Sequence, residues 1–162
     1  MESTGDRRTI TKRIDTMMTD TKERLEERFA ESPIVRASNA PSDAEIDEAA
    51  QALGVLFDSD YREFVRLYGG AMVGPYPIFG LRPVEVMDDE LWAVVTVTER
   101  YRETGIAKIA EWYVVSEDHA GNPVGVDAEG KVWTYDHDFG GPAVIASSFE
   151  EYLRSKCLSL SD

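Results

Sequence analysis

The apolar residues of this 162-residue chain change their period near residue 111, and this change constrains the fold more than any other feature. Before it, apolar residues recur every three or four positions over residues 9–31, 46–53 and 61–68, as on one face of a helix. After it, "WYVVS", "GNPVGVD", "KVWTYD" and "AVIA" have the short apolar or alternating pattern of strands. Because only turns separate these runs, they predict an antiparallel meander. The order of the segments predicts an α+β fold, with N-terminal helices, the meander and a closing C-terminal helix.

Residues at the ends of the helices support this prediction. Ser42, with Glu45 three residues later, forms the pattern of a capping box, and Gly54 suits the left-handed position that ends a helix. Gly69-Gly70 is expected to stop the next helix, whose inward face carries Tyr61, Phe64, Val65 and Tyr68.

The middle of the chain is ambiguous. The run Val94–Thr98 favours a strand, whereas Leu91, Val94, Val95, Thr98 and Arg102 fit a helical stripe. Acidic residues at 88–90 and basic residues at 100 and 102 match the preferences of the two ends of a helix. We therefore predict a helix over 88–104, preceded by a short strand at 77–81 in a loop rich in glycine and proline.

The closing helix, "SSFEEYLRSKCL", is predicted to begin with a second capping box, made by Ser147 and Glu150. It should pack on the sheet through Phe149. The residues expected in the core around it are Trp112, Val114, Trp133, Phe149 and Leu153.

Both histidines of the chain stand among carboxylates, His119 in "SEDHAGN" and His137 in "TYDHDFGG". A catalytic zinc site often uses two histidines and a carboxylate. However, the stretches are rich in Asp, Asn and Gly, which favour turns, and successive strand residues such as Asp136 and His137 point to opposite faces. We interpret the stretches as turns at strand ends and predict no metal and no cofactor.

No catalytic pattern stands out elsewhere. The chain has no G-x-S-x-G motif, "GGAMVG" lacks the Lys-Ser/Thr of a phosphate loop, and Cys157 has the setting of a half-buried helix residue. We assign no catalytic residue. A single cysteine, no apolar run of the about 20 residues that span a membrane, and no signal-peptide pattern predict a cytoplasmic protein.

The acidic charge is unevenly distributed. The net charge is −14, and residues 85–138 contribute −9 of it. Such a field disfavours nucleic acid and anionic membranes as partners and speeds encounter with basic proteins, although acidity also serves solubility. The carboxylates of this region concentrate at Asp88, Asp89, Glu90, Glu117, Asp118, Asp136 and Asp138.

Two blocks of the chain resemble the SUKH superfamily, the Smi/Knr-like proteins. The first is "IDEAAQALGVLFDSDYREFVRLYGGAM", and the second runs from "VVSEDHAGNPVGVDAEGKVWTYDHDFGG" to "IASSFEEYL". The resemblance covers about residues 42–155. It implies an α+β domain over 42–162, with residues 1–41 as a helical extension and linker of the same compact unit.

The resemblance also implies a function without catalysis, since many bacterial members look like immunity proteins that neutralise a toxin. We therefore expect a cytoplasmic immunity protein whose partner is a cognate toxin with a basic, nuclease-type surface. The carboxylates named above would contact the toxin, with Tyr76 and Phe79 as aromatic anchors. A regulatory scaffold that binds a self protein is the alternative, and a small metal-dependent hydrolase is a less favoured one.

Overall fold

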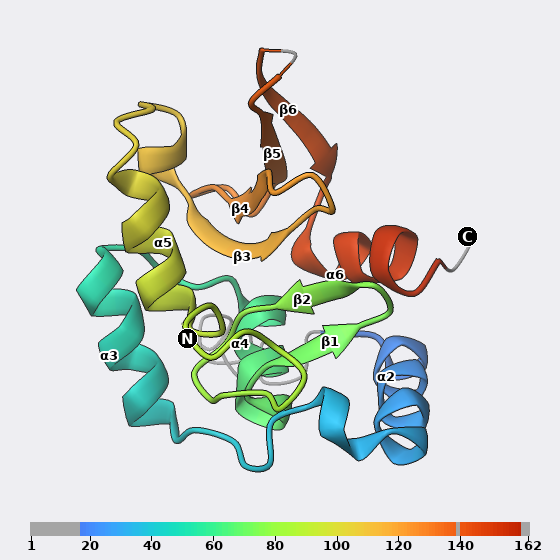
Figure 1. Ribbon diagram of the computed structural model, residues 1–162. Helices are drawn as coiled ribbons and strands as arrows, with labels where there is room; N and C mark the ends of the chain where they lie inside the picture. The colour runs from blue at the N-terminus through green and yellow to red at the C-terminus, as the bar shows by residue number, and fades with distance from the viewer. Residues whose placement is uncertain (1–16, 139, 160–162) are drawn as a thin grey trace, which may run out of the picture.

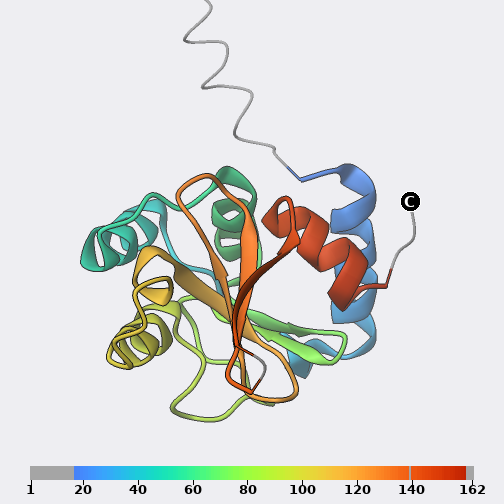
Figure 2. The ribbon, with the colours of Figure 1, turned by 90° about the horizontal axis from the view of Figure 1, so that it is seen from above.

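The computed structural model describes residues 17–138 and 140–159, and it confirms the α+β fold. A four-stranded antiparallel sheet follows the order β3-β4-β5-β6, and a separate hairpin pairs β1 with β2. Viewed from above, the sheet runs through the middle of the molecule, with α3 and α5 on one side and α2 and α6 on the other (Figures 1 and 2).

The elements in chain order are α2 (Thr19–Glu31), η1 (Pro33–Val35), α3 (Asp43–Leu53), α4 (Ser59–Tyr68), β1 (Ala71–Val73), β2 (Tyr76–Ile78), α5 (Val94–Arg102), η2 (Ile109–Glu111), β3 (Tyr113–Glu117), β4 (Pro123–Val126), β5 (Val132–Asp136), β6 (Gly141–Ala146), α6 (Phe149–Tyr152) and η3 (Leu153–Cys157).

Helices α3 and α4 form as their sequence predicts. The Ser42 hydroxyl accepts a hydrogen bond from the Glu45 amide at 3.2 Å, and the Glu45 carboxylate accepts one from the Ser42 amide at 2.8 Å. Gly54 ends α3 with φ of 71°, a conformation that a residue without a Cβ adopts at little cost. Gly69 ends α4 in the same region, and all four apolar residues predicted for the inward face of α4 are buried.

The helix predicted over residues 9–31 corresponds to α2, which begins at Thr19, and residues 9–16 of the prediction, with Ile10 and Ile14, lie outside the described residues. The backbone amide of Met17 donates to the Glu63 carboxylate at 2.7 Å, and that of Met18 donates to Glu150 at 2.8 Å. Because these carboxylates come from α4 and α6, a contact from distant parts of the chain sets where α2 begins.

The ambiguous stretch is a helix, but it covers only Val94–Arg102 and not residues 88–93. The amide of Val94 donates to the Gly80 carbonyl at 2.9 Å, and Ala93 forms an isolated bridge with Gly80. The chain before Val94 is therefore held extended against Gly80 and cannot continue the helix. Asp88 instead closes a turn, since its carboxylate accepts from the Glu90 amide at 2.8 Å.

The strands of the meander lie where the sequence predicts them, and the structure also contains a small hairpin earlier in the chain. The predicted strand at 77–81 is the shorter β2, and its partner β1 was not expected. Beyond β2, the Phe79 amide donates to the Val115 carbonyl at 2.8 Å, which joins the hairpin to β3. Gly130 has φ of 89° in the turn between β4 and β5, as the hairpin prediction requires.

The cap of the closing helix is one residue later than predicted. Ser148 is the N-cap, and its hydroxyl accepts from the Glu151 amide at 3.0 Å. The Glu150 carboxylate does not cap the helix, because it binds the Met18 amide and the Thr21 hydroxyl of α2. After Tyr152 the helix widens into the π-helical turn η3.

The predicted core is right at four of five positions, since Trp112, Val114, Phe149 and Leu153 are buried. Trp133 is only partly buried, which contradicts the prediction. Its ring lies 6.2 Å from that of Trp112 and 4.2 Å from the Lys108 ammonium. These two residues flank η2, so Trp133 is covered in part by the ends of this short helix.

Candidate functional site

The two acidic stretches of the sequence meet at one end of the sheet. In an antiparallel meander, the β3–β4 turn and the β5–β6 turn lie at the same end, and the β4–β5 turn lies at the other. Asn122 joins the two turns: its side-chain amide donates to the Asp118 carboxylate at 3.1 Å, and its carbonyl accepts from the His137 amide at 3.1 Å. We call Glu117, Asp118, Asp136 and Asp138 the acidic sheet end.

Two of the four carboxylates of the acidic sheet end also hold its turns in shape. Asp118 accepts from the amides of Ala120 and Asn122, both at 2.9 Å, and Asp136 accepts from the Asp138 amide at 2.8 Å. The Asx turns agree with the interpretation of these stretches as strand-ending turns. These bonds hold the Asp118 and Asp136 carboxylates in a fixed arrangement.

Glu117 is held by a phenol from α5. The Tyr101 hydroxyl donates to the Glu117 carboxylate at 2.7 Å, and it also lies 2.9 Å from the Gly121 carbonyl. Burial and the Glu117 carboxylate raise the pKa of Tyr101 well above its usual value. The phenol therefore stays protonated and attaches the β3–β4 turn to the helix.

The two histidines are placed by aromatic rings. His119 stacks on Tyr76 with ring centroids 4.8 Å apart and an interplanar angle of 19°, and the His137 ring lies 6.0 Å from that of Tyr135. Tyr76 thereby brings the β1–β2 hairpin to the acidic sheet end. Within residues 17–138 and 140–159, no group of three or more His, Cys, Asp or Glu side chains is arranged to hold a metal ion.

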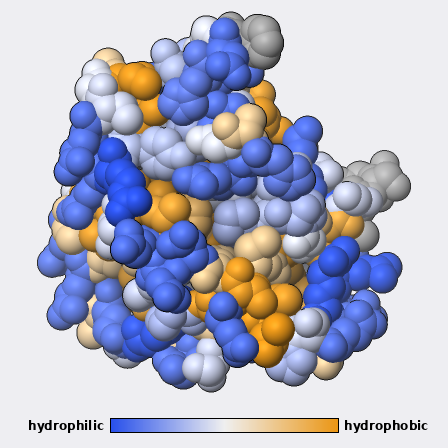
Figure 3. Space-filling view, viewed as in Figure 1, coloured by the Kyte–Doolittle hydropathy of each residue, from blue (hydrophilic) through white to orange (hydrophobic). Residues whose placement is uncertain are grey.

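The structure does not bring every predicted contact residue to this place. Phe79 is 1% exposed and belongs to the core, so its side chain has no surface for a partner, contrary to the expectation. Asp88, Asp89 and Glu90 are exposed in the loop between β2 and α5, outside both turns. Asp89 lines a shallow depression of about 570 Å³ beside η1, where apolar residues gather on the surface (Figure 3).

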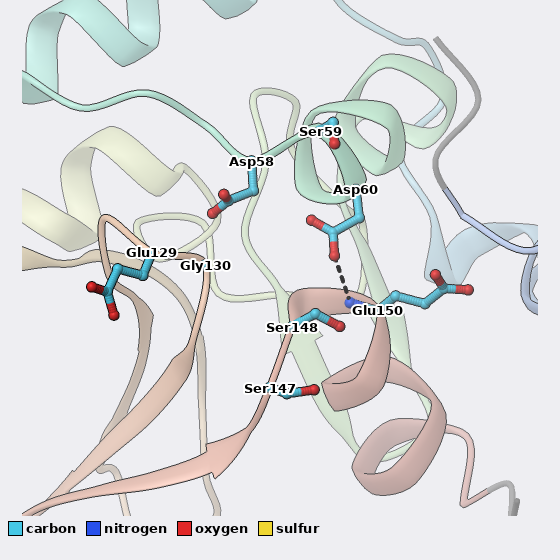
Figure 4. Close-up of a pocket in the computed structure, with 8 residues that line it drawn as sticks. All are labelled: Asp58, Ser59, Asp60, Glu129, Gly130, Ser147, Ser148 and Glu150. Carbon is cyan, nitrogen blue, oxygen red and sulfur yellow. Dashed lines mark hydrogen bonds between the residues drawn. The ribbon is translucent and has the colours of Figure 1, made fainter. Parts of the chain in front are cut away.

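A second concentration of carboxylates lies at the opposite end of the sheet, and the sequence analysis did not single it out. Asp58, Asp60, Glu129 and Glu150 line a pocket of about 330 Å³, although the Glu150 carboxylate points away from it and binds α2 (Figure 4). We call it the acidic pocket. Its residues come from the α3–α4 linker, α4, the β4–β5 turn and α6, and no spacing in the sequence connects them.

Two carboxylates of the acidic pocket are fixed by bonds to the fold. Asp58 accepts from the Tyr113 hydroxyl at 2.8 Å, and Asp60 accepts from the Glu150 amide at 3.0 Å, as the dashed line in Figure 4 shows. Burial raises the pKa of both Asp58 and Asp60. Within the described part of the chain, neither has an ion-pair partner, so an incoming cation would be favoured there.

The only cysteine is buried, 1% exposed, in η3. Burial raises the pKa of the Cys157 thiol to about 12. The residue is therefore a thiol at neutral pH and packs as part of the core rather than presenting a nucleophile.

The chain is similar to a known protein family. A SUKH family model described as SMI1-KNR4 cell-wall matches residues 18–158. No curated protein matches the chain. The match begins at α2, which the sequence resemblance left out, and the buried Leu25 and Phe29 of this helix join the same core as the sheet. Among the described residues, no helix is long and apolar enough to cross a membrane.

Proposed function

The chain belongs to the SMI1-KNR4 (SUKH) family, which includes immunity proteins, and from this premise we propose that it binds and neutralises a cognate bacterial toxin by stoichiometric blockade in the cytoplasm. The partner we propose is a basic, nuclease-type toxin domain. A nuclease needs a basic surface to hold a phosphate backbone, and an acidic protein can occupy that surface.

The acidic sheet end is the observation that carries this proposal. Its four carboxylates come from two turns, at 117–118 and 136–138, which Asn122 links through hydrogen bonds to the Asp118 carboxylate and the His137 amide. Rigid side chains lose little conformational entropy when a partner binds, which favours affinity at a given contact area.

The stacked pair Tyr76–His119 adds an aromatic surface next to these charges. Aromatic residues beside a rim of charge are typical of protein interfaces, where the rings supply contact energy and the charges supply orientation. The acidic sheet end would therefore speed association, and the ring pair would slow dissociation.

Kinetics across a salt series test the proposal. The probe is the cognate toxin domain, whose gene we expect next to the gene for this chain, and the variant replaces Asp118, Asp136 and Asp138 with Asn. Asn retains a carbonyl that can close the same turns. We expect blockade at one equivalent of the wild-type protein, and an association rate about tenfold lower for the variant, with a flatter salt dependence.

A second variant, with Asp88 and Asp89 replaced by Asn and Glu90 by Gln, removes the same amount of charge from another surface. A larger effect at the acidic sheet end would place the contact there, and equal effects would mean that only the overall field matters. Unchanged association in both variants would contradict an acidic interface, and failure of the wild-type protein to block the toxin would contradict the function.

A further inference from the structure

Leu56 is the most exposed large apolar side chain in the described part of the chain. It is 90% exposed, whereas Met18, Ile34, Val86 and Val144 are between 44% and 50% exposed. Burying such a side chain in a complex gains about 1.5–3 kcal/mol, so its exposure marks a place where a partner gains contact energy.

Leu56 stands at a groove that is lined mainly by apolar residues. The groove has a volume of about 410 Å³ and lies between the α3–α4 linker, the end of α5, η2 and the β4–β5 turn. Apolar surface is available from Leu56, the partly buried Val55 and the exposed Ala110 and Ala128, whereas Leu53, Tyr113 and Val126 are buried beneath it. The linker is held at both ends, because the Val55 amide donates to the Ala50 carbonyl at 3.0 Å and the Asp58 amide donates to the Tyr113 hydroxyl at 2.9 Å, and Arg102 donates to the Leu53 carbonyl at 2.9 Å just before it.

Arg102 does not make the groove a site for anions. Its second guanidinium nitrogen donates to the Trp112 carbonyl at 3.0 Å, so both terminal nitrogens bind main-chain oxygens of the fold. The other charged side chains of the groove, Glu111 and Asp127, are acidic.

The groove and the acidic pocket share the same two segments of backbone. The linker supplies Leu56 to the groove and Asp58 to the acidic pocket, and the β4–β5 turn supplies Ala128 to the groove and Glu129 to the acidic pocket. Gly130 allows the turn to approach Asp58, since a Cβ built on it would lie 3.2 Å from the Asp58 carboxylate oxygen. An apolar surface and an acidic surface are therefore adjacent.

We propose that the groove at Leu56 and the acidic pocket together dock one segment of a partner protein, which presents a large apolar side chain next to a lysine or arginine. The apolar side chain would pack on Leu56 in the groove, and the cation would meet Asp58, Asp60 and Glu129. A second copy of this chain is disfavoured, because its net charge of −14 would place acidic surface against acidic surface.

This inference rests on the proposed function only in taking the partner to be a protein. The surface lies at the opposite end of the sheet from the acidic sheet end, so each can be changed without touching the other.

A random peptide library, panned on the immobilised full chain, identifies the kind of segment that this surface binds. We expect enriched peptides that share a large apolar residue adjacent to lysine or arginine. Leu56→Ser should weaken their binding about tenfold or more, as for an interface anchor, and Asp58→Asn should weaken it and reduce its salt dependence.

Val144→Ser is the matched control, because Val144 is half exposed on β6 and lies outside both cavities. It should leave peptide binding unchanged. Since Leu56 is almost fully exposed, Leu56→Ser should keep the wild-type melting temperature, so a loss of binding would not reflect unfolding.

Several results would overturn the inference. These are the absence of a shared motif, a motif without a cation, or peptide affinity that is equal for wild type and Leu56→Ser. A molecular mass that rises with concentration in wild type but not in Leu56→Ser would assign the groove to a second copy and overturn it as well. The peptide assay needs no toxin, so its outcome is independent of whether toxin blockade is observed.

Discussion

Replacing Phe149 with Ala tests how the closing helix is attached to the core. Phe149 is 1% exposed at the start of α6, and its ring meets the rings of Tyr61 at 5.2 Å and Phe64 at 5.7 Å in edge-to-face geometry. Truncating a buried phenylalanine costs about 3–5 kcal/mol, from lost transfer energy and the cavity left behind. Two aromatic pairs add about 0.5–1.5 kcal/mol each to what is lost, so we expect the upper half of that range.

The loss should be visible in both thermal and urea unfolding. For a domain of this size, each 1 kcal/mol lowers the melting temperature by roughly 2–4 °C, so the shift should be at least about 8 °C. Val144→Ala is the control, because truncating a half-exposed side chain changes stability by roughly 0.5 kcal/mol or less. An unchanged melting temperature for Phe149→Ala, with an unchanged urea midpoint, would refute the packing of α6 on α4.

Three further predictions concern both ends of the sheet and the two histidines. Asn122→Ala should destabilise the protein by about 1–3 kcal/mol in urea unfolding, because the Asp118 carboxylate and the His137 amide each lose a partner. Faster amide exchange confined to the β3–β4 and β5–β6 turns would confirm that Asn122 links them. The double change of His119 and His137 to Ala should leave fold and partner binding nearly intact, and stoichiometric zinc in the purified wild-type protein, lost in the double variant, would contradict the turn interpretation. Burial raises the pKa of Asp60 above its value in the unfolded chain. The contribution of Asp60 to stability is therefore present at low pH and is lost as the pH rises through the folded pKa. Asp60→Asn should raise the stability measured at pH 7 relative to wild type, and this advantage should disappear on acidification.

The sequence predicted that the acidic stretches form turns, but not how the two turns lie relative to each other. Asp118 and Asp136 were placed in turns at strand ends from residue type alone, since Asp, Asn and Gly favour turn geometry over short distances. That the two turns adjoin depends on the strand order and on Asn122, whose side chain reaches across the sheet end. Phe79 was misjudged because a glycine- and proline-rich loop is usually exposed, whereas here its backbone pairs with β3 and its ring turns into the core.

The acidic pocket and the groove at Leu56 had no signal in the sequence that could have found them. Asp58 belongs to one turn pattern and Glu129 to another, and each is ordinary in its own segment. Only the packing of the linker against the β4–β5 turn brings them together. The exposure of Leu56 was equally hidden, because an apolar residue next to Val55 and Phe57 has the pattern of a buried segment.

Local interactions explain which features of this protein its sequence determined by itself. The capping box of α3, the glycine stops after α3 and α4, and the alternation along β4 and β5 depend on residues a few positions apart, so they follow from residue type and spacing. The tertiary structure decided where α2 and α5 begin, which serine caps α6 and which carboxylates share a surface. In these cases a hydrogen bond or packing contact from a distant part of the chain competes with the local preference and prevails, because an unsatisfied backbone amide or carboxylate costs more than a shifted helix end.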